Sequence, residues 1–468
     1  MLQDILILMR SEMMLTLIIF LLLFLKLGQA SLRNETVMNM VNGLLVATLA
    51  IGFFISDSGE LFGNMFRTND LLRLEKNMLT LGALIISLQS SQWLKQQQHA
   101  MEFYLLMIST LLGMFFMLSS ANLLMFYLGL ELSTIPLAAM VNFDLHKKQS
   151  SEAAFKMIVS SAFASGLLLF GISWLYGTTG TVAFAELPAG LNGSSLQLFA
   201  FVAILAGFGF KISAVPFHLW TADVYEGAPI PVTSYLSVIS KGAVLFVFVS
   251  VLYTVFSGMG EVWYNMLFLI SVATMIVGNL FALRQQNMKR FLAFSSIAQI
   301  GFILVGISGQ SQEGAAALIF FVLIYIFSNL GAFGVISLVS SATGHEKIDD
   351  YKGFYQTNPV LTWILAIALF SLAGIPPTAG FFGKFFLILA GAGKGNWLLI
   401  TIAALNMIVS LYYYLRVIKA MFMDHNPSPM AKIDIPVSPK LALAICVAGI
   451  LITGLYSGAY QYIYQLLS

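Results

Sequence analysis

Cysteine, histidine and charged side chains are all scarce in this chain of 468 residues. The single cysteine, Cys446, cannot form an internal disulfide or hold an iron–sulfur cluster. The five histidines are scattered, which argues against a haem held by two of them. A Gly-x-Gly-x-x-Gly sequence is absent, and the glycines around Lys394 lack the spacing of a phosphate loop. We therefore expect no cofactor and no metal in this chain.

Charged residues make up 9% of the chain and hydrophobic residues 59%, whereas soluble domains have about 25% charged residues. This composition excludes a soluble globular protein. The formal net charge of +2 gives no reason to expect nucleic acid as a partner. The partner that this composition predicts is the lipid bilayer.

Long apolar runs predict an all-α polytopic membrane protein with about fourteen transmembrane helices. The first run lacks a convincing cleavage site, so we interpret it as a retained helix and not a signal peptide. Gly374-Ile-Pro376-Pro377 divides the twelfth, which is too long for one straight span. The predicted helices cover residues 13–30, 37–56, 78–95, 101–118, 121–142, 152–176, 198–220, 230–256, 262–283, 289–308, 314–341, 358–390, 396–422 and 438–464.

Lys and Arg residues are distributed unevenly between the predicted loops. Loops after odd-numbered helices hold 14 of them, and loops after even-numbered helices hold 4, including Lys76. Because cytoplasmic loops carry the excess of Lys and Arg, the odd-numbered loops are expected inside the cell. Both termini are then expected outside, on the periplasmic face of a bacterial inner membrane.

A weak internal repeat relates the two halves of the chain. Residues 206–211 (Ala-Gly-Phe-Gly-Phe-Lys) are similar to residues 379–384 (Ala-Gly-Phe-Phe-Gly-Lys), each within a helix broken by proline. Two copies of five helices would face opposite ways in the membrane, as in many transporters. We therefore predict three N-terminal helices (1–100), two inverted five-helix repeats (101–256 and 257–423) and a final helix (424–468).

Lys211 lies in the middle of an apolar segment, five residues before Pro216. A charge near the bilayer centre costs about 3 kcal/mol on insertion scales unless it has a partner or water. Proline breaks the hydrogen-bond ladder of a helix and frees carbonyl oxygens beside the lysine. Broken helices of this kind form ion sites in transporters, although a lysine near a helix end can also extend to the headgroups.

Glu131 is the one acid that we place deep in a predicted span, and Lys156, Lys211, Lys241 and Lys384 also lie within spans. Burial disfavours the charged form of a carboxyl or amino group, and a nearby opposite charge restores it. One carboxylate and several lysines at similar depth are suited to moving protons. The alternative is a static ion pair that holds helices together, although buried pairs stabilise proteins poorly.

Three stretches resemble the antiporter-like membrane subunits of respiratory complex I. They are residues 209–229, residues 287–301 (Asn-Met-Lys-Arg-Phe-Leu-Ala-Phe-Ser-Ser-Ile-Ala-Gln-Ile-Gly) and residues 372–385, which contain Gly374-Ile-Pro376-Pro377. The resemblance covers nearly the whole chain. The Gly-Leu-Glu-Leu sequence at Glu131, with a lysine at position 384, is most similar to the subunit N branch of this family.

The resemblance implies fourteen helices in two inverted repeats, with breaks at Pro216 in helix 7 and at Pro376 and Pro377 in helix 12. It implies a proton path through Glu131, Lys211, Lys241 and Lys384, with Lys156 as an accessory. The second half lacks a counterpart of Glu131, and three tyrosines (412–414) stand where a second Lys241 would fall. We therefore interpret the second half as the exit side.

The leading hypothesis is a proton-translocating, non-redox subunit of NADH:quinone oxidoreductase. NADH, flavin, iron–sulfur clusters and quinone are then expected in other membrane and peripheral subunits. One alternative is a subunit of a multisubunit cation/proton antiporter or a related membrane hydrogenase, because these complexes share the fold. A purely structural scaffold is the third, but it would need no charge inside the membrane.

The charge asymmetry makes a prediction about the C-terminus. A cysteine placed there should react with a membrane-impermeant thiol reagent in intact cells, because both termini are expected outside. Labelling that requires cell lysis would contradict this orientation.

Overall fold

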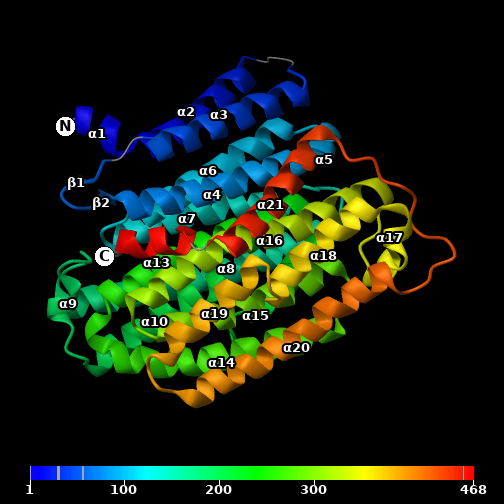
Figure 1. Ribbon diagram of the computed structural model, residues 1–468. Coiled ribbons are helices and arrows are strands. Elements are labelled where there is room, and N and C mark those ends of the chain that lie inside the picture. The colour runs from blue at the N-terminus through cyan, green and yellow to red at the C-terminus, as the bar shows by residue number, and fades with distance from the viewer. Residues whose placement is uncertain (1, 29–31, 55–56, 457, 468) are drawn as a thin grey trace. The chain divides into compact units, whose positions relative to one another are not determined.

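The structure is a computed structural model and describes residues 2–28, 32–54, 57–456 and 458–467, which are almost entirely helical (Figure 1). The chain divides into two compact units. The first unit comprises Met1–Leu84, Leu94–Ile212 and Ser240–Trp263. The second comprises Ile85–Trp93, Ser213–Ile239 and Tyr264–Ser468.

The elements before residue 213 include a short antiparallel hairpin, which the sequence did not predict, in addition to the helices. They are α1 (Leu2–Leu8), α2 (Arg10–Leu27), α3 (Asn34–Phe54), β1 (Gly59–Leu61), β2 (Phe66–Thr68), α4 (Asp70–Gln89), α5 (Ser91–Lys95), α6 (Ala100–Leu118), α7 (Leu123–Val141), α8 (Lys148–Thr179), α9 (Leu187–Gly190) and α10 (Ser195–Ile212).

The elements after residue 212 are helical throughout the described residues. They are α11 (Leu219–Gly227), α12 (Ile230–Tyr235), the π-helical segment η1 (Leu236–Ser240), α13 (Lys241–Thr254), η2 (Ser257–Met259), α14 (Gly260–Arg284), α15 (Met288–Ser308), α16 (Gln312–Thr343), η3 (Ile348–Tyr351), α17 (Phe354–Thr357), α18 (Pro359–Ala373), α19 (Ala379–Ala392), α20 (Trp397–Phe422), α21 (Val437–Leu455) and α22 (Gly458–Leu467).

Eleven helices among the described residues are long and apolar enough to cross a membrane. The helices α2 and α4 are not among them because each carries three or more charged residues. The apolar helices α18 and α19 are shorter, with 15 and 14 residues. These findings confirm an all-helical membrane protein.

Two predicted boundaries need correction. The predicted helix 438–464 is two helices, because α21 ends at Leu455 and α22 begins at Gly458. The predicted helix 78–95 begins earlier, at Asp70, and divides into α4 and α5. The predicted ends at 29–30 and 55–56, and residue 457 inside the last predicted helix, lie outside the described residues.

Both predicted proline breaks coincide with interruptions of a helix. α10 ends at Ile212 and α11 begins at Leu219, with Pro216 between them. α18 ends before Gly374, which adopts a φ of 87° that favours glycine, and α19 begins three residues after Pro376. The chain therefore leaves the helical ladder near each of the two lysines, Lys211 and Lys384.

Glycines allow the helices of the first unit to approach closely. A Cβ on Gly129 of α7 would lie 2.5 Å from the backbone nitrogen of Met117 in α6. A Cβ on Gly207 of α10 would lie 2.7 Å from the Leu168 Cβ in α8. Small residues at such contacts are how membrane helices pack without a hydrophobic driving force. This packing brings the polar residues of α7, α8 and α10 together.

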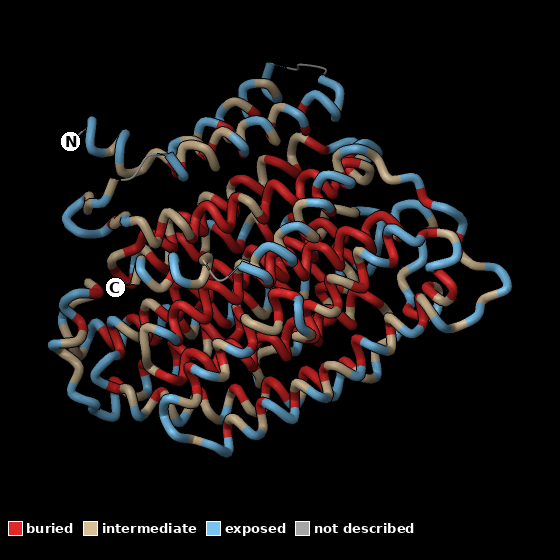
Figure 2. The backbone as a smooth tube through the Cα atoms, in the orientation of Figure 1, coloured by how far each residue is buried: buried red, intermediate tan, exposed pale blue. Residues whose placement is uncertain are grey.

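The core of the second unit is formed by α15 and α16, which contact each other and are buried along most of their length (Figure 2). The broken pair α18 and α19 packs against α16, and α20 packs against α15 and α18. Polar side chains that lie on these inner helices are consequently enclosed.

Candidate functional site

Glu131 lies on α7, whose start is fixed by a side-chain cap. The Asn122 side chain accepts a hydrogen bond from the Met125 backbone nitrogen at 2.6 Å. The Oε1 atom of Glu131 is buried and accepts no hydrogen bond from the described residues. Buried carboxylate oxygens normally have partners, so this oxygen is available to accept a proton or a donor that is not part of the chain.

Lys211 is the last residue but one of α10 and donates hydrogen bonds to two hydroxyl groups. Its Nζ lies 2.7 Å from the Oγ1 of Thr134 on α7 and 3.0 Å from the Oγ of Ser161 on α8. The Thr134 hydroxyl itself donates to the Leu130 carbonyl at 2.6 Å, so its lone pairs remain for Lys211. The sequence predicted freed carbonyls as the partners of this lysine, but the structure gives it hydroxyls.

Glu131 and Lys211 interact without direct contact. The carboxylate of Glu131 acts electrostatically on Lys211. No ion pair between these two side chains is found among the described residues, and both of Lys211's hydrogen bonds go to hydroxyls. The static ion pair that we considered from the sequence is therefore not the arrangement in this structure.

Lys241 is 2% exposed and begins α13, directly after the π-helical segment η1. Such segments are rare and are frequently found at functional sites. Within the first unit, α7 packs on α8, α8 on α10, and α10 on α13. Glu131, Lys211 and Lys241 are therefore carried by helices that contact one another in succession.

Lys156 differs from the other three lysines because it lies on the surface of the first unit. Its side chain is 39% exposed and forms an ion pair with Glu152, one turn earlier on α8, at 2.7 Å. The structure therefore does not place it with the buried lysines.

Lys384 is 1% exposed and lies beside the break between α18 and α19. Its Nζ donates to the carbonyl oxygen of Ala373, the last residue of α18, at 3.2 Å. The same ammonium lies 4.9 Å from the centre of the Phe302 ring, which attracts cations. Here the lysine does bind a carbonyl that a helix break has freed.

Hydroxyl and amide groups form a buried network in the second unit. Gln299 donates to the Leu372 carbonyl at 3.0 Å and to the Tyr414 hydroxyl at 3.1 Å, while Ser295 lies 2.5 Å from that hydroxyl. Further links are Ser328–Ser371 at 2.7 Å, Asn329–Ser237 at 2.7 Å, Ser237–Tyr325 at 3.3 Å and Tyr413–Asn279 at 2.9 Å.

The three tyrosines in α20 are not equivalent. Tyr413 and Tyr414 are fully buried and belong to this network, whereas Tyr412 is 67% exposed. The sequence drew attention to the tyrosines because they stand where a counterpart of Lys241 would fall in the second repeat. It gave no sign of the serines, Gln299 or Asn329. Isolated polar residues in apolar helices have no characteristic spacing, so only the folded chain brings them together.

A second group of buried charges was also missed by sequence reasoning. Lys76 and Glu12 are 3% and 2% exposed and form an ion pair at 2.5 Å. Glu75 is also buried and interacts electrostatically with Arg67 and Lys76. Glu131 is therefore not the only acid with a buried carboxyl oxygen among the described residues, and Lys76 lies in a helix and not in the loop where we expected it. The cause is the early start of two helices: α4 begins at Asp70 and includes Glu75 and Lys76, and α2 begins at Arg10 and includes Glu12.

The buried groups are suited to proton transfer. A lysine ammonium can donate a proton, and carboxylate, hydroxyl and amide oxygens can accept hydrogen bonds. Serine and tyrosine hydroxyls both donate and accept, so a chain of them can pass a proton along. Among the described residues, no three His, Cys, Asp or Glu side chains gather as they would around a metal ion.

Comparison with known proteins gives a consistent result. Residues 120–410 match the protein family described as NADH:quinone oxidoreductase/Mrp antiporter, TM. The NADH-quinone oxidoreductase subunit N of Phocaeicola vulgatus is 45% identical over 458 residues, which cover 97% of each chain.

Two solved structures share the fold. One is a chain of respiratory complex I from Thermus thermophilus with bound aureothin, with 28% identity, a TM-score of 0.82, and coverage of 96% of this chain and 97% of that one. The other is a chain of the Mrp complex from Dietzia sp. DQ12-45-1b, with 20% identity, a TM-score of 0.86, and coverage of 98% and 95%. The chain therefore belongs to the family of antiporter-like membrane subunits of NADH:quinone oxidoreductases and Mrp antiporters, in the branch of NADH-quinone oxidoreductase subunit N.

Proposed function

We propose that this chain is a proton-translocating subunit in the membrane arm of an NADH:quinone oxidoreductase. Electron transfer takes place in other subunits of the complex and supplies the free energy. The identity of 45% to a subunit N over nearly the whole chain favours this function over that of a cation/proton antiporter, whose solved relative is 20% identical. The similarity to the Mrp chain supports the fold alone.

The proposal rests mainly on two buried lysines, Lys241 and Lys384, and a half-buried one, Lys211, with no carboxylate in direct contact with Lys211 or Lys384. A lysine that is locked in an ion pair gives up its proton reluctantly. Lys211 is held by two hydroxyls and Lys384 by one carbonyl, which are weaker partners than a carboxylate. Neither lysine has to break a direct ion pair when it loses its proton.

The proposed path begins at Glu131 and continues to Lys211 and Lys241, with Lys384 on the exit side and Lys156 as an accessory. We assign the serine, tyrosine and Gln299 network of the second unit to the exit side as well. A change of charge on Glu131 alters the electrostatic stabilisation of Lys211, which couples the protonation of the two groups.

We also propose the finer membrane arrangement. The eleven candidate spans, together with α2, α4 and the α18–α19 pair, would make fourteen crossings. Residues 101–256 and 257–423 would be the inverted repeats, and both termini would face the outside of a bacterial inner membrane. The excess of Lys and Arg in alternate loops supports this orientation.

Glu131→Gln tests the proposed function. Glutamine keeps the shape of the side chain but cannot take up a proton, so NADH-driven proton pumping and quinone reductase turnover should fall together several-fold. Both are measured in membrane vesicles at matched abundance of the complex. Glu186→Gln, at an exposed position before α9, should leave both unchanged. Normal pumping and turnover in Glu131→Gln would remove the proposed role.

Thr134→Val tests whether the hydroxyl partners matter to Lys211. Valine has the shape of threonine but cannot accept the hydrogen bond from the ammonium, so turnover should fall while the helix remains intact. Ser133→Ala is the matched control, because the Ser133 hydroxyl bonds only to the Leu130 carbonyl of its own helix. If both variants lose the same activity, the loss is caused by altered packing of α7 and not by the missing hydrogen bond to Lys211.

Substitutions of Lys384 separate proton transfer from fixed charge. Arginine stays protonated at any accessible pH, so Lys384→Arg should fail nearly as badly as Lys384→Ala if this lysine must release its proton. If it only supplies positive charge, arginine should restore activity. NADH-driven acidification of vesicles at equal complex abundance distinguishes the two, and full activity of Lys384→Arg would contradict the assignment.

A further inference from the structure

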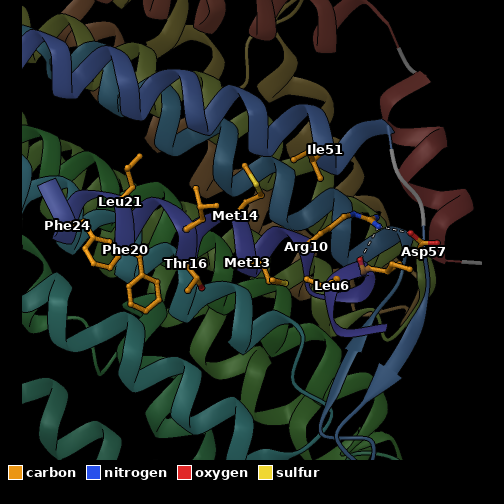
Figure 3. Close-up of a pocket in the computed structure, with 12 residues that line it drawn as sticks. Leu6, Arg10, Met13, Met14, Thr16, Phe20, Leu21, Phe24, Ile51 and Asp57 are labelled. Atoms are coloured by element: carbon orange, nitrogen blue, oxygen red, sulfur yellow. Dashed lines mark hydrogen bonds and ion pairs between the residues drawn. The ribbon is translucent and has the colours of Figure 1, made fainter. Parts of the chain in front are cut away.

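A long groove runs along α2 in the first unit. Its cavity volume is about 990 Å³, in the upper range of small-molecule sites. Leu17 of α2 lines it. Figure 3 shows Phe20 and Phe24 of the same helix, and Ile51 of α3, which also line it. Even Thr16 presents little polarity, because its hydroxyl donates to the Glu12 carbonyl at 2.8 Å.

One end of this groove is charged. The Arg10 guanidinium forms an ion pair with Asp57 at 2.6 Å, and both side chains line the cavity (Figure 3). The Arg10 and Asp57 side chains are 14% and 39% exposed, so Arg10 is largely enclosed while Asp57 can be reached from outside. The groove therefore has an apolar body and one end with a positive and a negative group side by side.

The apolar body has the length of one lipid leaflet. From Met13 to Phe24 the helix rises about 16 Å, at about 1.5 Å per residue. Half of the hydrocarbon core of a bilayer is about 15 Å thick. When α2 crosses the membrane, this stretch begins just below Arg10 and Asp57 at the depth of the lipid headgroups, and an acyl chain of one leaflet is long enough to follow most of it.

The paired charges select the headgroup. Guanidinium groups bind phosphate with two parallel hydrogen bonds, whereas carboxylates accept from ammonium donors. A purely anionic headgroup would be attracted by Arg10 and repelled by Asp57. A zwitterionic headgroup with a phosphate and a primary ammonium meets both groups, and a quaternary ammonium could not donate a hydrogen bond to Asp57.

We propose that this groove is a binding site for one phospholipid of the phosphatidylethanolamine type. The phosphate lies at Arg10, the primary ammonium lies at Asp57, and an acyl chain runs along α2 as far as Phe24. The lipid fills a groove walled by α2 and α3. Glu12, which pairs with Lys76, belongs to the same helix but does not line the groove.

Photoactivatable lipids test the site in the intact complex, reconstituted in nanodiscs. Three probes carry the same acyl-chain crosslinker and an ethanolamine, choline or glycerol phosphate headgroup. Adducts are mapped by mass spectrometry of peptides from α2. We expect the ethanolamine probe to label the stretch between Met13 and Phe24 several-fold more than the other two.

Three variants separate the site from ordinary lipid contact. Arg10→Gln and Asp57→Asn should each reduce labelling by the ethanolamine probe to the level of the choline probe. Lys26→Gln is the matched control, because Lys26 is a cation on the same helix that pairs with Glu102 at 2.6 Å and does not line the groove. Its labelling should equal that of the unaltered complex.

Two results would overturn the proposal. Equal labelling by all three headgroups in the unaltered complex would mean that α2 contacts only bulk lipid. Absence of lipid adducts, with crosslinks to a neighbouring subunit instead, would mean that the groove is a protein interface. The headgroup comparison needs no substitution, so the test stands even if Arg10→Gln impairs assembly.

Discussion

The cost of placing an ammonium group inside a membrane protein governs the arrangement of this chain. Each buried lysine requires polar atoms that belong to neighbouring helices, and the helices must approach closely enough to supply them. For Lys211 those atoms are the hydroxyls of Thr134 and Ser161, on two different helices. The glycines at the α6–α7 and α8–α10 contacts are therefore as necessary to the site as the hydroxyls.

The two broken helices meet the same requirement by different means. At Lys384 the break itself provides the acceptor, because the carbonyl of Ala373 has no partner further along its own helix. At Lys211 the acceptors come from side chains on α7 and α8. Similar sequences around the two lysines therefore produce different surroundings. A short internal repeat indicates where such a lysine lies, but it does not determine what holds the ammonium.

The sequence predicted the features that depend on a single residue, such as a proline, or on hydropathy averaged over a long run of residues. Apolar runs located nearly every helix, and the prolines located both breaks, because each of these signals is local. The partners of Lys211 could not be predicted, since serine and threonine are common in membrane helices and carry no spacing signal. The buried pair of Glu12 and Lys76 was missed for a related reason. Their burial depends on where α2 and α4 begin and on how these helices pack, and charges near a helix end resemble loop charges in the sequence.

The π-helical segment before Lys241 has a consequence for how this protein tolerates change along its length. A π turn holds one residue more than an α turn, so it shifts the direction of all later side chains by about 100°. Converting this segment to a regular α-helix of the same length would therefore turn Lys241 about 100° away from its present direction, whereas deleting one residue at the same time would leave that direction unchanged. In this segment, substitutions that favour the regular α-helical hydrogen-bond pattern would misdirect the lysine even if chain length and hydropathy were unchanged, so the local backbone pattern is as constrained as residue identity.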